Sequence, residues 1–327
     1  MHIPDNYLSP STCATLGVTM IPIWKWASTK VKKEMSRQKM PLLGICTAFV
    51  FLIMMFNIPL PGGTTGHAVG ATLAAILLGP YSAVIAVTIA LAIQALFFGD
   101  GGILALGVNC FNMAFIMPFV AFYIFKFVKE NFPSERGQYV GAFLAGYISL
   151  NVAALLTAIE FGIQPMLFTD NVGLPLYSPY GLNIAIPAMM IPHLLVAGIL
   201  EGLVTAGVYA YVKKLSPEII YKGTSKKIKP LYALIVSLVI LSPLGVLATG
   251  TAWGEWAPEE LKEFIGFIPK GMIEGFNFSA PIPDYAISGV SEIIAYIFSA
   301  LVGVGLIFTL IKLLSKSQFK NNPEKVK

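Results

Sequence analysis

Charged residues and cysteines are both scarce in this chain of 327 residues. Lys, Arg, Asp and Glu make up 12% of it, about half of the ~25% found in soluble globular domains. Cys13, Cys46 and Cys110 stand singly without CxxC spacing, which excludes a cysteine metal cluster and indicates small buried apolar residues. With 56% hydrophobic residues, the composition predicts an all-α polytopic membrane protein.

Several functional motifs are also missing. The stretch GGTTGHAV has glycines but lacks the lysine of GxxxxGK, so we expect that the chain does not hydrolyse ATP itself. The absence of HExxH argues against a zincin-type membrane protease. The opening MHIPDNYLSP has neither a basic run nor an apolar core, and so does not begin a signal peptide. The net charge of +5 arises from short inter-helix loops, which does not predict nucleic-acid binding.

Hydropathy predicts nine apolar helical segments. The stretch from 67 to 98 reads as one helix or as two, and Gly79-Pro80 favours two because proline removes a helix donor and disfavours a helical preceding residue. The predicted segments are 8–24, 41–57, 67–79, 81–98, 103–125, 138–161, 184–212, 231–249 and 287–313.

The distribution of basic residues supports nine spans. With the break at Gly79-Pro80, all but two of the 22 Lys and Arg residues fall on one side of the membrane, the exceptions being Lys262 and Lys270. The positive-inside rule then predicts an N-terminus outside and a C-terminus in the cytoplasm.

The third segment is too short to cross the bilayer from surface to surface. Its thirteen residues, 67–79, extend about 20 Å as a helix, against a hydrocarbon core of about 30 Å. We therefore expect the Gly- and Pro-rich loop at 57–67 to lie below the outer surface. Irregular backbone at that depth is tolerated where it is buried in protein or lines a cavity, which predicts a site with His67 at its floor.

Met1 and His2 form a potential chelating pair. Histidine is a large second residue, so we expect Met1 to be retained with a free amine. The amine, the deprotonated amide of His2 and its imidazole can bind a divalent metal through fused five- and six-membered rings. His67 is the natural fourth donor. Four nitrogens in a plane suit Ni(II) or Cu(II), whereas zinc prefers a tetrahedron.

Three motifs carry a family resemblance. MHIPDNYLSPSTC, IPLPGGTTGHAVGATLAAILLGP and ALFFGDGGILALGVNCFNMA, within residues 1–215, resemble the CbiM/NikM family of substrate-binding membrane subunits of energy-coupling-factor (ECF) transporters. The resemblance implies capture of Ni²⁺, with Co²⁺ as the second choice, by Met1, His2 and His67. It also implies an ECF coupling membrane subunit and ABC-type ATPases as partners, and a place in the bacterial or archaeal cytoplasmic membrane.

Other polar residues admit two interpretations each. Asp5 and Asn6 either orient the His2 ring, as partners of metal-bound imidazoles do, or form a turn ahead of the first helix. Asn57 and Thr64 either line the site or make loop hydrogen bonds. FFGDGG (97–102) predicts a tight exterior turn, and Asn109 and Asn112 are expected to join helices.

The seventh segment carries two ionisable residues, His193 and Glu201. Ionisable groups inside a span are functional candidates, and their spacing of eight puts both near one helical face. We predict a buried polar network that holds the bundle together, in preference to a second metal site.

The pattern changes near residue 216. A basic linker at 216–229 separates a metal-binding domain (1–215) from a two-helix unit (230–327) with an acidic outer loop at 250–286. This layout, and SPLGVLATGTAWGEW, resemble the CbiN/NikN accessory subunits fused in cis. The loop is either solvated surface or a helper in metal loading.

Two rival classes remain. An autonomous secondary carrier or channel predicts internal repeats and midplane carboxylates; no clear repeat is present, and Glu201 is the only carboxylate near the centre of a span. A metalloenzyme needs an open coordination position and a general base, and no base is evident.

Overall fold

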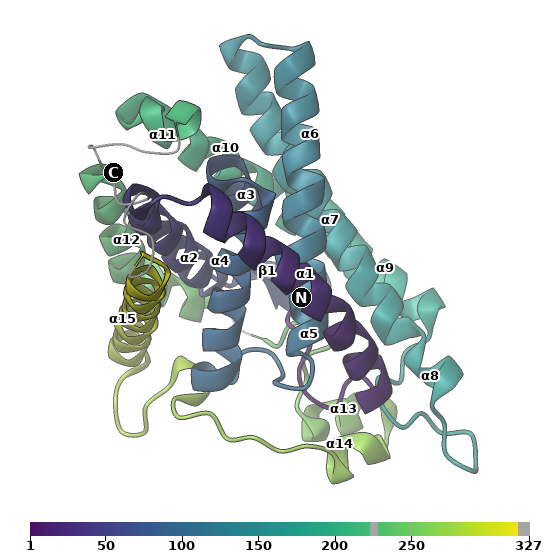
Figure 1. Cartoon of the computed structure of the whole chain (residues 1–327). Coiled ribbons are helices and arrows are strands. Elements are labelled where there is room, and N and C mark those ends of the chain that lie inside the picture. The colour runs from purple at the N-terminus through teal and green to yellow at the C-terminus, as the bar shows by residue number, and fades with distance from the viewer. Residues whose placement is uncertain (223–227, 249, 320–327) are drawn as a thin grey trace.

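The structure is a computed structural model that describes residues 1–222, 228–248 and 250–319. Within this part, seven helical stretches are long and apolar enough to cross a membrane, with mean hydropathies from 1.3 to 2.4. Figure 1 shows the helices packed into one bundle, which confirms the predicted all-α membrane protein. The stretches are Arg37–Met54, Pro80–Phe98, Leu106–Asn131, Glu135–Leu167, Leu182–Leu215, Lys229–Leu247 and Glu292–Gln318.

Two of the nine predicted segments do not qualify as spans. Helix α1 (Pro10–Glu34) begins with Ser9 as a side-chain cap and has 25 residues, but it contains Pro22 and a polar, basic last turn. Helix α3 (Ala71–Leu78) has eight residues, too few for a core of about 30 Å. The predicted count of nine spans is therefore not reached by hydropathy and length among the described helices.

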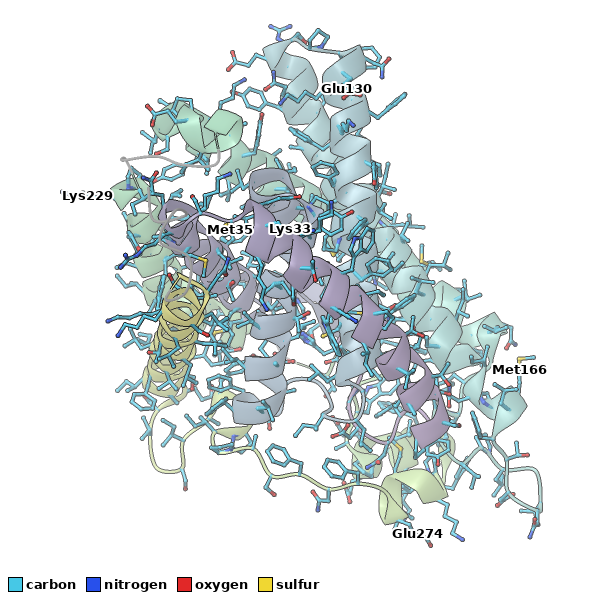
Figure 2. All side chains as sticks on the ribbon, viewed as in Figure 1. Lys33, Met35, Glu130, Met166, Lys229 and Glu274 are labelled. Carbon is cyan, nitrogen blue, oxygen red and sulfur yellow. The ribbon has the colours of Figure 1, made fainter. Side chains whose placement is uncertain are left out.

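Labelled lysines lie in one half of the molecule. Figure 2 places Lys33 and Lys229 in the upper half of the view, where Glu130 also lies, and Glu274 at the bottom. This is the asymmetry on which the predicted orientation rests, with basic loops in the cytoplasm. The orientation itself stays a prediction.

The break at Gly79-Pro80 is confirmed. Helix α3 ends at Leu78, Gly79 adopts a positive φ of 82°, and α4 (Pro80–Ile93) starts at the proline. A proline at the first helical position costs nothing, because its missing N–H would have no partner there. One continuous helix over 67–98 is thus excluded.

The loop predicted to be irregular contains a short hairpin. Strand β1 (Ile58–Leu60) pairs antiparallel with β2 (Thr64–Gly66), and the turn uses Gly62 and Gly63 at positive φ, which glycine adopts without strain. The pairing satisfies backbone groups of β2, all three residues of which are buried. It also sets the path of the chain into His67.

Three of the long stretches contain a π-helical turn, a feature frequent at functional sites. These turns, with their flanking helices, are η2 (Gln94–Phe98) after α4, η3 (Cys110–Ile116) between α5 (Leu106–Asn109) and α6 (Met117–Asn131), and η4 (His193–Ala197) between α9 (Leu182–Pro192) and α10 (Gly198–Leu215). The other elements up to the linker are η1 (Arg37–Lys39), α2 (Met40–Met54), α7 (Glu135–Gly162), α8 (Gln164–Leu167) and α11 (Pro217–Lys222).

The predicted basic linker at 216–229 is described only in part, since residues 223–227 lie outside the described residues. The C-terminal unit that follows packs its helices α12 and α15 against α2, and Gly303 of α15 leaves no room for a Cβ beside Phe51. Its elements are α12 (Lys229–Leu241), η5 (Ser242–Leu247), α13 (Pro258–Ile265), α14 (Lys270–Glu274), η6 (Pro283–Tyr285) and α15 (Glu292–Phe319). Figure 1 shows α13 and α14 at the end of the molecule where α1 begins.

Candidate metal centre

The first three residues are enclosed by the protein. Met1, His2 and Ile3 are 9%, 2% and 0% exposed. The backbone of Ile3 is clamped by Asn109, whose Oδ1 accepts from the Ile3 N–H at 2.9 Å and whose Nδ2 donates to the Ile3 carbonyl at 3.1 Å. Gly102 N–H donates to the same carbonyl. The N-terminal backbone is therefore held in place by groups that satisfy its buried hydrogen bonds.

Asp5 and Asn6 also fix the path of the N-terminus. The Asp5 carboxylate accepts from the backbone N–H groups of residues 103–105 at 2.8–3.3 Å, ahead of α5. Asn6, at a positive φ of 68°, exchanges two hydrogen bonds with the backbone of Phe276 in the C-terminal unit. These are the contacts of an anchored turn, and the carboxylate that contacts the His2 ring is a different one.

That carboxylate is Asp100. Its Oδ1 lies 2.8 Å from His2 Nδ1, at the centre of the FFGDGG turn that the sequence assigns to the exterior. Gly99 and Gly101 flank it at positive φ, conformations that only glycine adopts readily. The two glycines thus turn the Asp100 side chain inward onto the histidine.

Asp100 has further partners. Its Oδ2 accepts from Tyr285 Oη at 2.5 Å and from Gln94 Nε2 at 3.0 Å. Burial alone raises the pKa of Asp100, but His2, His67 and the Tyr285 hydroxyl together hold its pKa well below the usual range. The site therefore carries a fixed negative charge beside the histidines.

His67 faces His2 from the loop before α3. The two rings stack with centroids 5.0 Å apart and an interplanar angle of 30°. His67 Nδ1 lies 3.0 Å from the Ala68 carbonyl, which can only accept, so Nδ1 carries the hydrogen and Nε2 holds the lone pair. Burial, and then the nearby His2 and N-terminal amine, lower the pKa of His67 to about 3. The ring is neutral at pH 7, the form that binds metals.

The N-terminal amine is paired with Glu255 of the C-terminal unit, at 3.1 Å. Glu255 belongs to the acidic outer loop for which the sequence left two interpretations open. This contact brings the loop to the candidate ligands. The C-terminal unit is thus a direct neighbour of the site.

These groups have the chemistry of a nitrogen metal site. His2 Nε2 is buried without a hydrogen-bond partner in the described part of the chain, and such an atom calls for a ligand or for a rotation of the ring. No group of three His, Cys, Asp or Glu side chains is arranged around a metal position among residues 1–222, 228–248 and 250–319. The ligand set predicted from the sequence is of another kind, because two of its four donors would be backbone nitrogens.

A cavity of about 340 Å³ adjoins the site. The N-terminal domain lines it with Asn57 and His67 among others, and the C-terminal unit with Glu255, Asp284 and Tyr285. Thr64 lines a smaller cavity together with Met1, His67 and His193, and its hydroxyl donates to the Thr251 carbonyl at 3.2 Å. Asn57 and Thr64 are therefore both lining residues, and Thr64 also joins the hairpin to the C-terminal unit.

His193 and Glu201 make separate contacts. His193 Nδ1 donates to the Met189 carbonyl at 2.7 Å. Glu201 reaches across to the loop after His67, where its carboxylate accepts from Val69 N–H at 2.7 Å and from Gly70 N–H at 3.0 Å. Of these two residues, Glu201 is thus the one that connects its helix, α10, to the loop after His67.

Sequence reasoning misses Asp100, Glu255 and Tyr285 at this site. Imidazole ligands usually pair with a carboxylate or a carbonyl, so an aspartate within a family motif is a signal that points to Asp100, although here it contacts Nδ1, the nitrogen that the predicted chelate of His2 would use. Glu255 is one of several acidic residues in its loop, and nothing in its local pattern singles it out. The same holds for Tyr285.

The comparisons with known proteins point to metal transport. The family model described as cobalt uptake substrate-specific transmembrane region (CbiM) matches residues 2–219, and the PDGLE domain model matches residues 229–318. The probable fused nickel transport protein LarMN of Lactiplantibacillus plantarum is 49% identical over 320 residues, which cover 95% of this chain and 96% of that protein. The fused nickel transport protein NikMN of Rhodobacter capsulatus is 45% identical, covering 94% and 95%.

A solved structure is similar as well. The crystal structure of a transition metal transporter, 52% identical, aligns with 70% of this chain and all of its own with a TM-score of 0.63. Together with the apolar helices, these likenesses identify a multi-pass protein of the cell membrane that acts in metal transport and is not an enzyme. The chain belongs to the CbiM family of metal-transport membrane proteins.

Proposed function

We propose that this protein captures Ni²⁺ as the substrate-specificity subunit of an ATP-driven ECF uptake transporter. The proposed ligands are the Met1 amine, the amide and imidazole of His2, and His67 Nε2. The observation that carries the proposal is the enclosure of the amine and of the His2 imidazole, with the half-buried His67 ring stacked on His2 beside one cavity. His67 has its Nδ1 committed to a carbonyl, which leaves Nε2 to bind the metal.

Loading the metal exchanges two contacts. Chelation by the amide and ring of His2 closes a six-membered ring through Nδ1, so the imidazole has to give up the contact of Nδ1 with Asp100. Nε2, which lacks a partner among the described residues, then becomes the ring nitrogen that can donate to a carboxylate. The Met1 amine similarly has to release Glu255. Both displaced carboxylates remain beside a divalent cation that their charge favours.

Nickel is the better-supported substrate. Four nitrogens in one plane suit Ni(II) and Cu(II), and three relatives aligned over nearly the whole chain are described as nickel transport proteins, one of them as probable and one as putative. The family model names cobalt in its description, which makes Co²⁺ the second candidate.

The ECF role rests on what the chain lacks and on its family. The sequence has no GxxxxGK motif for binding ATP, so ATP-driven uptake would use partner ATPases and a coupling membrane subunit, as the family resemblance implies. The alternative is an autonomous carrier or channel. A single buried acidic residue within the seventh segment, Glu201, supports the carrier less well because it is engaged with backbone groups.

Two measurements test the proposal. The full chain with an unmodified N-terminus is titrated calorimetrically with Ni²⁺ and Co²⁺, and we expect one tight site that prefers nickel. Proteoliposomes carrying the chain alone, or the chain with its coupling subunit and ATPases, are then assayed for nickel uptake. ATP-dependent uptake by the full complex alone supports the ECF role, whereas equal uptake by the chain alone supports the carrier.

A further inference from the structure

One peptide group connects His67 to the interior of the protein. The carbonyl between Ala68 and Val69 accepts from His67 Nδ1 at 3.0 Å. The N–H of the same peptide donates to Glu201 Oε2 at 2.7 Å. The imidazole and the carboxylate thus share a single rigid, planar amide.

Glu201 holds more than this peptide. Its carboxylate also accepts from Gly70 N–H, at 3.0 Å to Oε2 and 3.2 Å to Oε1, and it makes a further hydrogen bond to Thr72. Gly70 precedes α3 at a positive φ of 74°. Glu201 therefore satisfies free N–H groups at the start of α3, a place that favours an anion.

The carboxylate is itself fixed by close helix packing. Glu201 is fully buried in α10, and a Cβ on Gly146 of α7 would lie only 3.0 Å from the Glu201 carbonyl oxygen. Helices α7 and α10 are thus pressed together at this level. Glu201, which anchors the loop after His67, is 132 residues from Val69 in the chain. It belongs to the membrane-spanning stretch Leu182–Leu215.

The arrangement determines which nitrogen His67 offers. The Ala68 carbonyl holds the hydrogen on Nδ1, and Nε2 retains its lone pair. A carboxylate on the N–H side of a peptide polarises the group and makes its carbonyl a stronger acceptor. Glu201 therefore supports both the direction and the tautomer of the ring without approaching the metal.

We propose that Glu201 is a positioning residue for metal capture, which holds the Ala68–Val69 peptide so that His67 presents Nε2 to the metal. The proposal rests on the proposed function, in which His67 is a ligand. Glu201, in the seventh predicted segment, would then contribute to nickel affinity in addition to joining helices.

The test compares variants of the full chain by nickel calorimetry and by the visible spectrum of bound Ni²⁺. Glu201→Met keeps the side-chain length but removes both acceptors, and we expect nickel affinity to fall about 10- to 100-fold, the range seen for partners of metal ligands. Glu201→Gln keeps one acceptor oxygen and should fall by less. Glu160→Gln is the matched control, because Glu160 is a buried carboxylate bonded to Asn112 and not to the His67 loop.

A double-mutant cycle separates positioning from folding. In a His67→Ala background, Glu201→Gln should leave the residual nickel affinity unchanged, because the ring it orients is gone. An equal loss in both backgrounds would show a merely structural role and overturn the proposal, as would Glu201 variants with the parent's affinity and spectrum. If His67→Ala itself left affinity intact, the proposed function would fail instead, so the two failures are distinguishable.

Discussion

The two histidines of the site are held by different parts of the chain. His67 is oriented by the Ala68 carbonyl and, through that peptide, by Glu201, all within the part that matches the CbiM family. His2 contacts Asp100, whose other oxygen accepts from Tyr285. Tyr285 belongs to the part that matches the PDGLE domain.

Like His2, the Met1 amine depends on the C-terminal unit, because Glu255 of that unit pairs with the amine. The His67 half of the site is therefore held by buried hydrogen bonds to the backbone. The N-terminal half, with Met1 and His2, is held through side chains of the C-terminal unit. This difference predicts that changes in the C-terminal unit act more strongly on Met1 and His2 than on His67, although the hairpin before His67 also contacts that unit through Thr64 and Thr251.

The largest effect is expected from blocking the amine. Acetylating Met1, or leaving an N-terminal tag in place, removes the amine as the first donor of the chelate. Without that donor, we expect the His2 amide to keep its proton and not to bind the metal. We expect nickel affinity to fall by more than roughly 1,000-fold, beyond the 10–100-fold that outer partners cost. Parallel calorimetry of native and acetylated chains measures this, and equal affinities would remove Met1 from the site.

Substitution of His67 removes one donor of the four. His67→Ala should lower nickel affinity by about 100-fold or more, because a water has to take its place. The thermal unfolding midpoint serves as the control and should stay close to that of the parent, since the loop is still held by Glu201. Nickel binding within a few-fold of the parent would contradict the assignment.

Acidity distinguishes the two halves. Ligand nitrogens must lose protons before binding, so affinity should fall at least about tenfold per unit as pH drops from 7.5 to 5.5. Burial, His2 and the N-terminal amine lower the pKa of His67 to about 3, so its ring is already neutral throughout this range and takes up no proton. The residual binding of His67→Ala should therefore keep the parent's pH slope, and a shallower slope would place a titrating ligand at His67.

Part of this site follows from the sequence, because it depends on local rules. The end of α3 at a Gly-Pro pair and the shortness of that helix come from hydropathy and proline chemistry. The hairpin in the loop at 57–67 is harder to predict, since Pro and Gly fit an irregular segment equally well. Hydropathy predicts an apolar segment at 8–24, whereas α1 extends to Glu34 and has 25 residues, because its second half is polar.

The partners of the ligands escape prediction for a different reason. Asp100 and Tyr285 meet from positions 185 residues apart, and Met1 and Glu255 from positions 254 apart. No periodicity or capping rule encodes such contacts, which depend on how whole units pack. Glu201 is a similar case, since its position in a span marks it as functional but does not show that it reaches the His67 loop.

Among the partners of His2, Asp100 is the one whose substitution should lower nickel affinity most. Asp100→Asn keeps the shape of the side chain but removes the negative charge beside His2, and we expect nickel affinity to fall roughly 10- to 30-fold. Asp170→Asn is the control, because Asp170 caps a surface turn with its own backbone neighbours. If the two variants bind nickel equally, Asp100 does not support His2.

The smallest and most discriminating effect concerns Tyr285. Tyr285→Phe deletes the hydroxyl that bonds Asp100 and keeps the ring that stacks on Phe98. Since it acts one hydrogen bond further from the metal than Asp100 does, we expect nickel affinity to fall by about threefold. Tyr296→Phe is the matched control, because the Tyr296 hydroxyl bonds the Met55 carbonyl and should leave affinity unchanged.

The same pair of variants measures how far the C-terminal unit controls the N-terminal half. Combined with Asp100→Asn, Tyr285→Phe should add no further loss, because its route to His2 passes through that carboxylate. Additive losses would mean that Tyr285 acts on the cavity directly. An unchanged affinity in Tyr285→Phe would show that Asp100 is positioned by its own turn, and that the two histidines differ less in their support than the contacts indicate.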